Sequence, residues 1–282
     1  MGAVLGAVGL IIGVLRWRFV KPYRSGSRSP YPSGAGRLHH VGGLLVGGVL
    51  VVWLISGALS MEPWGMFHSR STVDPGALQG MPLHADALGD VSAGLSRLRR
   101  SGIEPVELYW RMLAGQAYLM GVDAHGNSRI LPALGHSRGQ LHLARSQLAD
   151  AVRVTWPHHR LTLDWLQNED FYYYHRGEPS LYSHLPRRLP MLRVRFDDAA
   201  GTWMHIDPYS AAVIEQLDSR RRAVRWAFKM LHSWDWPPLL RHGWLRDALT
   251  LAVSAGVLLI TASGLVLGWR RVRRPRRQKA RM

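Results

Sequence analysis

The sequence contains no cysteine, and this absence excludes several kinds of site and cofactor. Without thiolates the chain has no disulfide framework, no Cys-ligated zinc or iron–sulfur cluster, and no covalent haem attachment through a Cys-x-x-Cys-His motif. The sequence also lacks a catalytic triad pattern, a His-Glu-x-x-His zinc motif and a phosphate-binding glycine loop. Any cofactor must therefore be held non-covalently by histidine, methionine, carboxylate or backbone groups.

Acidic residues are missing from two stretches that hold much of the positive charge. The chain has 36 Lys and Arg against 19 Asp and Glu, a formal net charge of +17. Residues 16–40 carry six basic residues and residues 270–282 carry eight, and neither stretch contains an acid. Because the rest of the chain is nearly balanced, the net charge does not indicate nucleic-acid binding. No nucleic acid is expected as a partner.

Two long uncharged runs lie next to these basic stretches. Val41–Met61 and Ala248–Trp269 each hold about twenty mainly apolar residues, enough at ~1.5 Å per residue to cross a hydrocarbon core of ~30 Å. A shorter run, "MGAVLGAVGLIIGVL", carries four glycines, and its basic residues follow the apolar stretch, unlike those of a cleaved signal peptide. The sequence thus predicts three membrane-spanning helices, with the lipid bilayer as a partner.

The positive-inside rule gives the expected orientation of these helices. Both basic stretches belong on the cytoplasmic side, which places the region between the last two helices outside. The expected location is a bacterial inner membrane, with the N-terminus outside and the C-terminus inside. In order, the sequence predicts a helix at 1–17, a cytoplasmic linker at 18–37, a helix at 38–62, a periplasmic α+β domain at 63–244, a helix at 245–269 and a cytoplasmic tail at 270–282.

The outer region shows the pattern of a helix followed by strands twice. Apolar spacing predicts helices over 84–100 and 145–156, and a further helix in "SRRRAVRWAFKML" before the last span. The runs "VELYWRML", "QAYLMGVD" and "AHGNSRIL" predict three strands after the first helix, and "DFYYYHR" (170–176), "MLRVRFDD" and "TWMHID" three after the second. The hairpins align at an offset of 84 residues, so Val122 and Ile206 are expected at equivalent inward positions of two copies of one unit.

Three stretches, taken in order, resemble the PepSY-associated transmembrane protein family. They are "RLHHVGGLL…WLISGALSMEPWGMF", "HIDPYSAAVI" and "LHSWDWPPLLRHGWLRDALTLAVSAGVLLITASGLVLGWRR". The resemblance implies that the outer domain consists of two PepSY-like units, each a helix on a small antiparallel sheet. For some members it also implies a haem-containing ferric-siderophore reductase with histidine ligands in the membrane.

The chain departs from the family pattern in two respects. The usual Asp-x-x-Thr-Gly turn is replaced by "DPYSA" at 207–211 and "DAHGN" at 123–127. In addition, the chain resembles only the later part of larger members, so it is either a short form or a piece that lacks upstream helices.

The second predicted span offers two candidate haem ligands at its inner end. Haem b between helices needs two imidazoles and small residues that let the macrocycle approach the backbone. His40 lies about 40° from the centre of the stripe formed by Gly43 and Gly47, and His39 about 60° away, at 100° per residue. The pattern slightly favours His40. The alternative is that both histidines are interfacial polar residues that close a helix end.

No other histidine lies on the predicted inner side, so a haem b there would need a homodimer, an upstream helix or a partner protein. At the outer end His68, His232 and His242 are candidate ligands, and His232 belongs to a family-like stretch. His40 and His232 cannot share one haem, because about a membrane thickness separates them. The remaining histidines of the outer domain, His205 among them, are expected to be ordinary polar residues.

Two functions remain open on the sequence. The first is haem-dependent electron transfer across the membrane toward ferric chelates, as in iron uptake, with a quinol or a redox protein as electron donor because the cytoplasmic segments are too short for a flavin or nicotinamide domain. The sequence identifies no catalytic residue for such a reductase and no metal site other than the haem iron. The second is a non-catalytic PepSY module that binds or regulates a periplasmic protein such as a peptidase.

Overall fold

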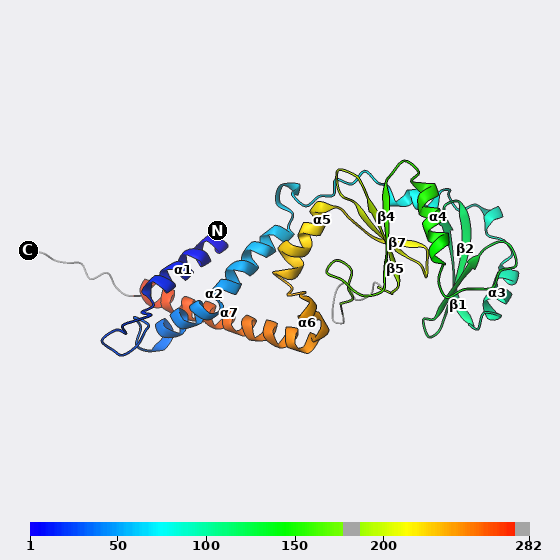
Figure 1. Ribbon diagram of the computed structural model, residues 1–282. Coiled ribbons are helices and arrows are strands. Elements are labelled where there is room, and N and C mark those ends of the chain that lie inside the picture. The colour runs from blue at the N-terminus through cyan, green and yellow to red at the C-terminus, as the bar shows by residue number, and fades with distance from the viewer. Residues whose placement is uncertain (177–186, 274–282) are drawn as a thin grey trace, which may run out of the picture. The chain divides into compact units, whose positions relative to one another are not determined.

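The computed structural model describes residues 1–176 and 187–273, which form two compact units (Figure 1). The helical unit consists of Met1–Met66 together with the chain from Val224 onward, and the sheet unit consists of Phe67–Ala223. The outer domain predicted at 63–244 therefore includes two segments, 63–66 and 224–244, that belong to the helical unit. Most of the predicted cytoplasmic tail lies outside the described residues.

Three apolar helices make up most of the helical unit. They are α1 (Gly2–Arg16), α2 (Gly34–Ser60) and α7 (Gly243–Val272). Shorter elements complete it: η1 (Pro63–Gly65), the π-helical segment η4 (Arg225–Met230), which continues α5 (Ser219–Val224), and α6 (Pro237–Arg241). The helix predicted before the last span is thus present as α5 and η4.

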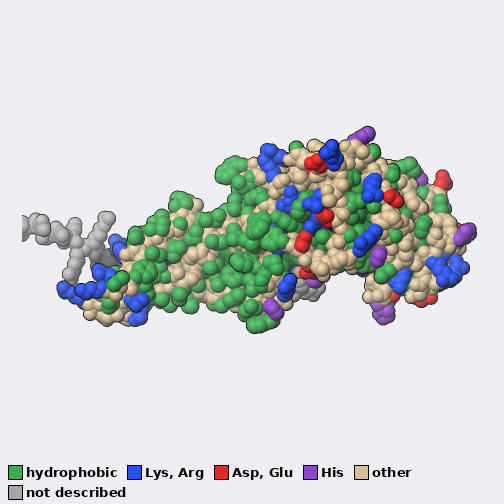
Figure 2. Space-filling view, viewed as in Figure 1, with side chains coloured by type: hydrophobic (Ala, Val, Ile, Leu, Met, Phe, Trp, Pro, Cys, Tyr) green, Lys and Arg blue, Asp and Glu red, His purple; other side chains and the backbone are tan. Residues whose placement is uncertain are grey.

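Two of these helices, α2 and α7, are long and apolar enough to cross a membrane. They have 27 and 30 residues, with mean hydropathies of 2.2 and 2.1 over their most apolar stretches. Hydrophobic side chains cover much of their surface (Figure 2). α1 has 15 residues and reaches only about 22 Å at ~1.5 Å per residue, less than a hydrocarbon core of ~30 Å. The prediction of three spans is therefore not confirmed for α1.

Glycines allow α2 and α7 to pack closely. A Cβ atom at Gly42 would lie 2.8 Å from Cγ2 of Ile260, and one at Gly256 would lie 2.9 Å from Cγ1 of Val46. Because the earlier residue of α2 meets the later residue of α7, the two helices are antiparallel. α1 folds back along α2 as a helical hairpin (Figure 1). The N-terminal end of α2 consequently lies beside the C-terminal ends of α1 and α7.

We expect Gly42→Ala to destabilise the helical unit and Gly43→Ala to leave its stability unchanged or slightly higher. Both changes replace a glycine inside a helix, which by itself is favourable by roughly 0.5–1 kcal/mol. At Gly42 the methyl group would lie 2.8 Å from Ile260, whereas nothing lies within 4 Å at Gly43. Overpacking of this kind costs about 1–3 kcal/mol. Thermal unfolding in detergent, followed by circular dichroism, measures the difference, and equal Tm values would contradict the close contact.

The sheet unit contains two antiparallel sheets and two main helices. The first sheet has the order β1 (Pro105–Leu113), β2 (Gln116–Asp123), β3 (Ser128–Pro132). The second has the order β4 (Leu161–Leu166), β5 (Met191–Phe196), β6 (Trp203–Asp207), β7 (Ala212–Leu217). The helices are α3 (Val91–Arg99) and α4 (Arg145–Thr155), and the short turns η2 (Pro75–Gln79) and η3 (Ala85–Ala87) precede α3. This architecture agrees with the predicted α+β class.

Helix α4 packs between the two sheets. The largest hydrophobic cluster joins residues from α4 with residues from both sheets. Its fully buried members include Leu148, Val152, Ile130, Val194, Met204 and Ile206. Helix α3 covers the other face of the first sheet, where Leu98 packs against Leu119 and Leu131. The layers therefore alternate as helix, sheet, helix and sheet.

Each sheet carries a helix, as the repeat predicts. The helix lies on the same face as the aligned residue in the second unit, but on the opposite face in the first unit. Val122 and Ile206 both face the core around α4. For Ile206 this is the face of the preceding helix. For Val122 it is not, because α3 lies on the side of the neighbouring Gly121, where a Cβ would be 2.7 Å from Leu98 Cδ1. Since side chains alternate along a strand, a shift of one residue reverses the face.

Two predictions of local structure are wrong. Residues 170–176, expected as a strand, form an irregular segment that bends at 171–173, because the Asp170 carboxylate accepts the N–H groups of Tyr172 and Tyr173 at 2.9 and 2.8 Å. This local bonding competes with the extended conformation that aromatic residues favour. The strand is instead β4, which the sequence reading missed. The helix expected from residue 84 begins at Val91, after a glycine with a φ of 66° and an Asp90 N-cap.

Candidate functional site

The structure places His40 at the N-terminal end of α2, where both of its ring nitrogens are hydrogen-bonded. Nε2 lies 2.9 Å from the carbonyl oxygen of Gly13 and Nδ1 lies 2.8 Å from Oγ of Ser29. A carbonyl can only accept, so Nε2 carries the proton and Nδ1 of the neutral ring accepts from the hydroxyl. His40 is also only 8% exposed. In this arrangement neither nitrogen offers a lone pair to a metal ion.

His39 is arranged differently from its neighbour. Its Nδ1 lies 3.0 Å from the carbonyl oxygen of Ile260 and 3.2 Å from Oγ of Ser263, both on α7. The Nδ1–H must donate to the carbonyl, which leaves Nε2 of the neutral ring unprotonated. A histidine that ligates a metal commonly donates its other N–H to a backbone carbonyl in this way. The hydrogen bonds therefore favour His39, whereas helical spacing had favoured His40.

A cavity of about 760 Å³ lies between α1, α2 and α7 beside the two histidines. This volume is within the ~300–1,000 Å³ typical of small-molecule sites. Glycines form part of its wall on both α1 and α2, among them Gly9 and Gly43. Arg16, Arg270 and Arg271 also line it. The cavity thus combines close backbone approach, a histidine with an open nitrogen, and positive charge.

These residues fit a haem for which this chain would supply one histidine ligand. His39 Nε2 has the chemistry of an iron ligand, and the glycines leave room for a flat macrocycle. The arginines match the two carboxylates of haem, because guanidinium groups pair with carboxylates bidentately. Within the described residues the cavity offers no second imidazole with an open nitrogen. A bis-imidazole site therefore needs a ligand from outside this chain or outside the described residues.

The other predicted ligands are not brought together with His39 and His40. His232 lies at the opposite end of α2, with Nδ1 3.2 Å from Oγ of Ser56 and its ring stacked on Phe228 at a centroid distance of 4.9 Å. From His40 to Ser56 the helix rises by about 24 Å. His242 is exposed at the start of α7, and His68 is exposed in the sheet unit.

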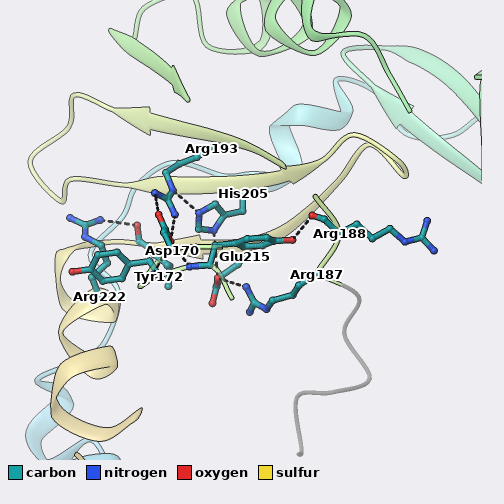
Figure 3. Close-up of polar contacts among 10 residues, drawn as sticks. Asp170, Tyr172, Arg187, Arg188, Arg193, His205, Glu215 and Arg222 are labelled. Carbon is teal, nitrogen blue, oxygen red and sulfur yellow. Dashed lines mark hydrogen bonds and ion pairs between the residues drawn. The ribbon is translucent and has the colours of Figure 1, made fainter. Parts of the chain in front are cut away.

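A second polar cluster, which the sequence reading did not predict, lies in the sheet unit on the face of the second sheet away from α4 (Figure 3). Strand register places Asp164, Arg193, His205 and Glu215 in one row across β4, β5, β6 and β7. Arg193 donates to both carboxylate oxygens of Asp170 at 2.6 and 3.0 Å, and its Nε donates to His205 Nε2 at 2.8 Å. We call Asp170, Arg193, His205 and Glu215, with Arg187, the polar row.

His205 is held neutral at the centre of the polar row. Its side chain is fully buried, and Nε2 must accept because Arg193 can only donate. The ring proton therefore lies on Nδ1, which is 3.5 Å from the Glu215 carboxylate, too far for a strong hydrogen bond. Burial, together with the charge of Arg193, lowers the pKa of His205. Protonation of His205 would have to occur at Nε2, where it would replace the hydrogen bond from the Arg193 guanidinium.

The carboxylates of the polar row remain ionised. Burial alone raises the pKa of Glu215, but contacts from His205 and from Arg187, at 3.0 Å, outweigh it and lower the pKa to about 2. Burial likewise opposes ionisation of Asp170, and the hydrogen bonds from Arg193 outweigh it and lower that pKa. Each charge in the row has an opposite partner, as buried charges require.

The contacts of the polar row hold the Asp170 segment to the second sheet. The row contains no hydroxyl or thiol nucleophile, and its histidine accepts from a guanidinium that cannot give up its proton. In the described parts of the chain, no group of three or more His, Asp or Glu side chains could hold a metal ion. The row instead ties the turn at Asp170 to the sheet. Comparison with models of protein families, with curated proteins and with solved structures returned no match for this chain.

Proposed function

We propose that this chain is a haem-dependent electron-transfer component of a bacterial inner membrane that acts on ferric chelates in the outer compartment. In this proposal the helical unit binds haem b, and the sheet unit consists of two PepSY-like modules. The resemblance in sequence to PepSY-associated transmembrane proteins supports the assignment. The observation that carries it is the placement of His39, which lines a cavity together with glycines and arginines while its Nδ1 bonds to the carbonyl of Ile260.

The arrangement of the basic residues supports the proposed orientation. Lys and Arg side chains gather at one end of the helical unit (Figure 2). Arg16 at the end of α1 and Arg270 at the end of α7 line the same cavity, beside the start of α2. Because positively charged loops stay in the cytoplasm, this end is the cytoplasmic one in our proposal. In this proposal the three helices cross the membrane with the N-terminus outside. The short helix α1 crosses packed against α2.

Bound haem would supply one-electron transfer. The role of the chain would be to hold it: His39 would ligate the iron, the Ile260 carbonyl would fix the tautomer of the imidazole, and the arginines would pair with the haem carboxylates. A second imidazole would come from a second copy of the chain, an upstream helix or another protein. A quinol or a redox protein is the proposed electron donor, because the described segments at the cytoplasmic end are short.

The proposal is tested by the absorption spectrum of the full chain, purified in mild detergent from haem-replete cells. We expect an intense Soret band and sharp bands on reduction, as for low-spin haem with two imidazoles. Haem content then identifies the source of the second ligand: one haem for two chains indicates that two copies share it. A protein that stays colourless, also with an N-terminal extension or a candidate partner restored, would refute haem binding. That result would favour the non-catalytic PepSY module that binds a periplasmic protein.

A further inference from the structure

Strand β1 forms an edge of the first sheet whose outward backbone groups have no partner in the described chain. β1 and β2 are joined by the two-residue turn Ala114-Gly115, so the flanking pair Leu113 and Gln116 exchanges both backbone hydrogen bonds. Bonded and non-bonded pairs alternate along an antiparallel ladder. The N–H and C=O groups of alternate residues, from Val106 to Met112, therefore point to the free edge. Apart from its ladder with β2, no backbone hydrogen bond of these residues reaches another described segment.

The side chains of this edge are exposed or half-buried from Val106 to Arg111, whereas Met112 and Leu113 at its end are buried. Val106 is 67% exposed and Tyr109 is 39% exposed, and Glu107 and Arg111 are exposed as well. Natural proteins shield such edges with lysines, bulges or short strands, because an open edge pairs with other chains. β1 has nine residues, contains no lysine, and shows a register shift only at its start, between Pro105 and Glu107. The strand is therefore open for pairing from Val106 to Arg111, whereas its end packs beside η2.

We propose that two copies of this protein associate through β1, which pairs antiparallel with itself about a two-fold axis at Tyr109. The two three-stranded sheets then become one sheet of six strands. The outward N–H and C=O groups of Leu108 meet those of Trp110 of the second copy, and Val106 meets Met112 in the same way. Strand addition at an exposed edge is a common mode of protein recognition, in which the main chain supplies much of the affinity.

Charge complementarity selects the register. With the axis at Tyr109, Glu107 of each copy lies opposite Arg111 of the other, which gives two ion pairs across the new ladder. Opposite charges in directly facing positions stabilise a strand pair, and like charges destabilise it. A shift by two residues places a charge opposite Tyr109. A shift by four residues sets Glu107 against Glu107, or Arg111 against Arg111. Only the proposed register pairs both charges of both strands.

Both faces of the paired strands are chemically matched. On the face that carries α3, Val106 would lie beside the buried Met112, and Leu108 beside Trp110. On the other face the two Tyr109 rings meet at the axis, between the ion pairs. The Tyr109 hydroxyl already donates to the Glu107 carboxylate at 2.5 Å, which holds that charge at the edge. A two-fold interface repeats each of these contacts, as symmetric dimers do.

This dimer does not depend on haem, and its test uses no pigment. The chain contains no cysteine, so a single introduced cysteine is unique. In Tyr109→Cys the two Cα atoms at the axis would be about 4.5 Å apart, a distance that suits a disulfide. Glu107→Cys and Arg111→Cys would each place their own two copies about 13 Å apart, at ~3.3 Å per residue. They should cross-link with each other when produced in one membrane, but not alone.

The cross-linking is measured on non-reducing gels after mild oxidation of membranes that contain the full chain. We expect a strong dimer band for Tyr109→Cys and for the mixed Glu107→Cys and Arg111→Cys sample. Val154→Cys is the control, because Val154 is 72% exposed on α4 and lies away from the edge. If Tyr109→Cys links no better than Val154→Cys, the proposed pairing is wrong.

A charge exchange tests the register without cysteines. Glu107→Arg and Arg111→Glu should each weaken dimerisation in detergent roughly tenfold, because each replaces two ion pairs by two repulsions. The double variant restores complementary charges and should dimerise like the original protein. Analytical ultracentrifugation gives the dissociation constants. Single variants that dimerise as well as the unchanged chain, or a double variant no better than the single ones, would overturn the register.

Discussion

Replacing His39 by alanine is expected to abolish haem binding, whereas replacing His40 should leave the haem in place and lower stability instead. The two residues are neighbours on α2, so their substitutions perturb the same helix end. Only His39 has a ring nitrogen without a hydrogen bond to the described chain, since both nitrogens of His40 bond to Ser29 and Gly13. His40→Ala leaves those two partners unsatisfied, at a cost of about 1–3 kcal/mol. Soret absorbance per protein, measured on full chains from haem-replete cells, distinguishes the variants.

A chemical rescue provides the control for this pair. His39→Gly leaves space for free imidazole, which should return the Soret band when it is added during purification. The same addition should not change the spectrum of His40→Ala. A His40 variant that loses its haem while the His39 variant keeps it would contradict the assignment made from the hydrogen bonds, though not haem binding as such.

Much of the helical unit can be predicted from the sequence, for a simple physical reason. A run of about twenty uncharged residues must satisfy its backbone internally, and the helix is the structure that does so within one segment. The run Val41–Met61 accordingly forms all but the first turns of α2, with Met61 as its C-cap, and Ala248–Trp269 lies within α7. α1 illustrates the limit, because its apolar run forms a helix of 15 residues, too short to meet the same criterion.

The choice between His39 and His40 could not be made from the sequence. Helical spacing gives the direction of each side chain. The angular distances of the two side chains from the glycine stripe, about 40° and about 60°, differ by only about 20°. The two histidines differ in their hydrogen-bond partners. His40 bonds to Gly13 and Ser29, and His39 bonds to Ile260. Ile260 lies 221 positions away along the chain. A periodicity within one helix carries no information about such a partner.

The polar row escaped prediction because it depends on strand register. Its signal was present as charged or polar residues at alternate positions in "LRVRF" and "MHID", where the other positions are apolar. Such alternation normally indicates a solvent-facing side of a sheet. Here Arg193 and His205 are 6% and 0% exposed. The face is covered by a turn that Asp170 forms, in a segment that aromatic content had suggested to be a strand.

Arg193→Met should be among the most destabilising substitutions in the sheet unit. Methionine keeps the length and apolar volume of the side chain but removes the hydrogen bonds to Asp170 and His205. Removing one partner of a buried ion pair costs about 3–5 kcal/mol, because the remaining charge stays partly buried without compensation. Asp170 is 35% exposed, so water can solvate its carboxylate after the substitution. The expected loss of unfolding free energy is therefore near the lower end of this range, at about 3 kcal/mol. For a unit of the size of Phe67–Ala223, that corresponds to a decrease in Tm of about 6–12 °C.

Arg195→Met is the matched control, because Arg195 lies two positions along the same strand and on the same face. Its ion pair with Asp164 joins side chains that are 44% and 36% exposed. Such pairs contribute only about 0–1 kcal/mol, so the Tm of this variant should stay close to that of the unchanged chain. Thermal unfolding of both variants in detergent, followed by intrinsic fluorescence, gives the comparison. Equal Tm values would mean that the polar row does not hold the Asp170 turn on the sheet, since Arg193 differs from Arg195 in the burial of its ion pair and in its hydrogen bond to His205.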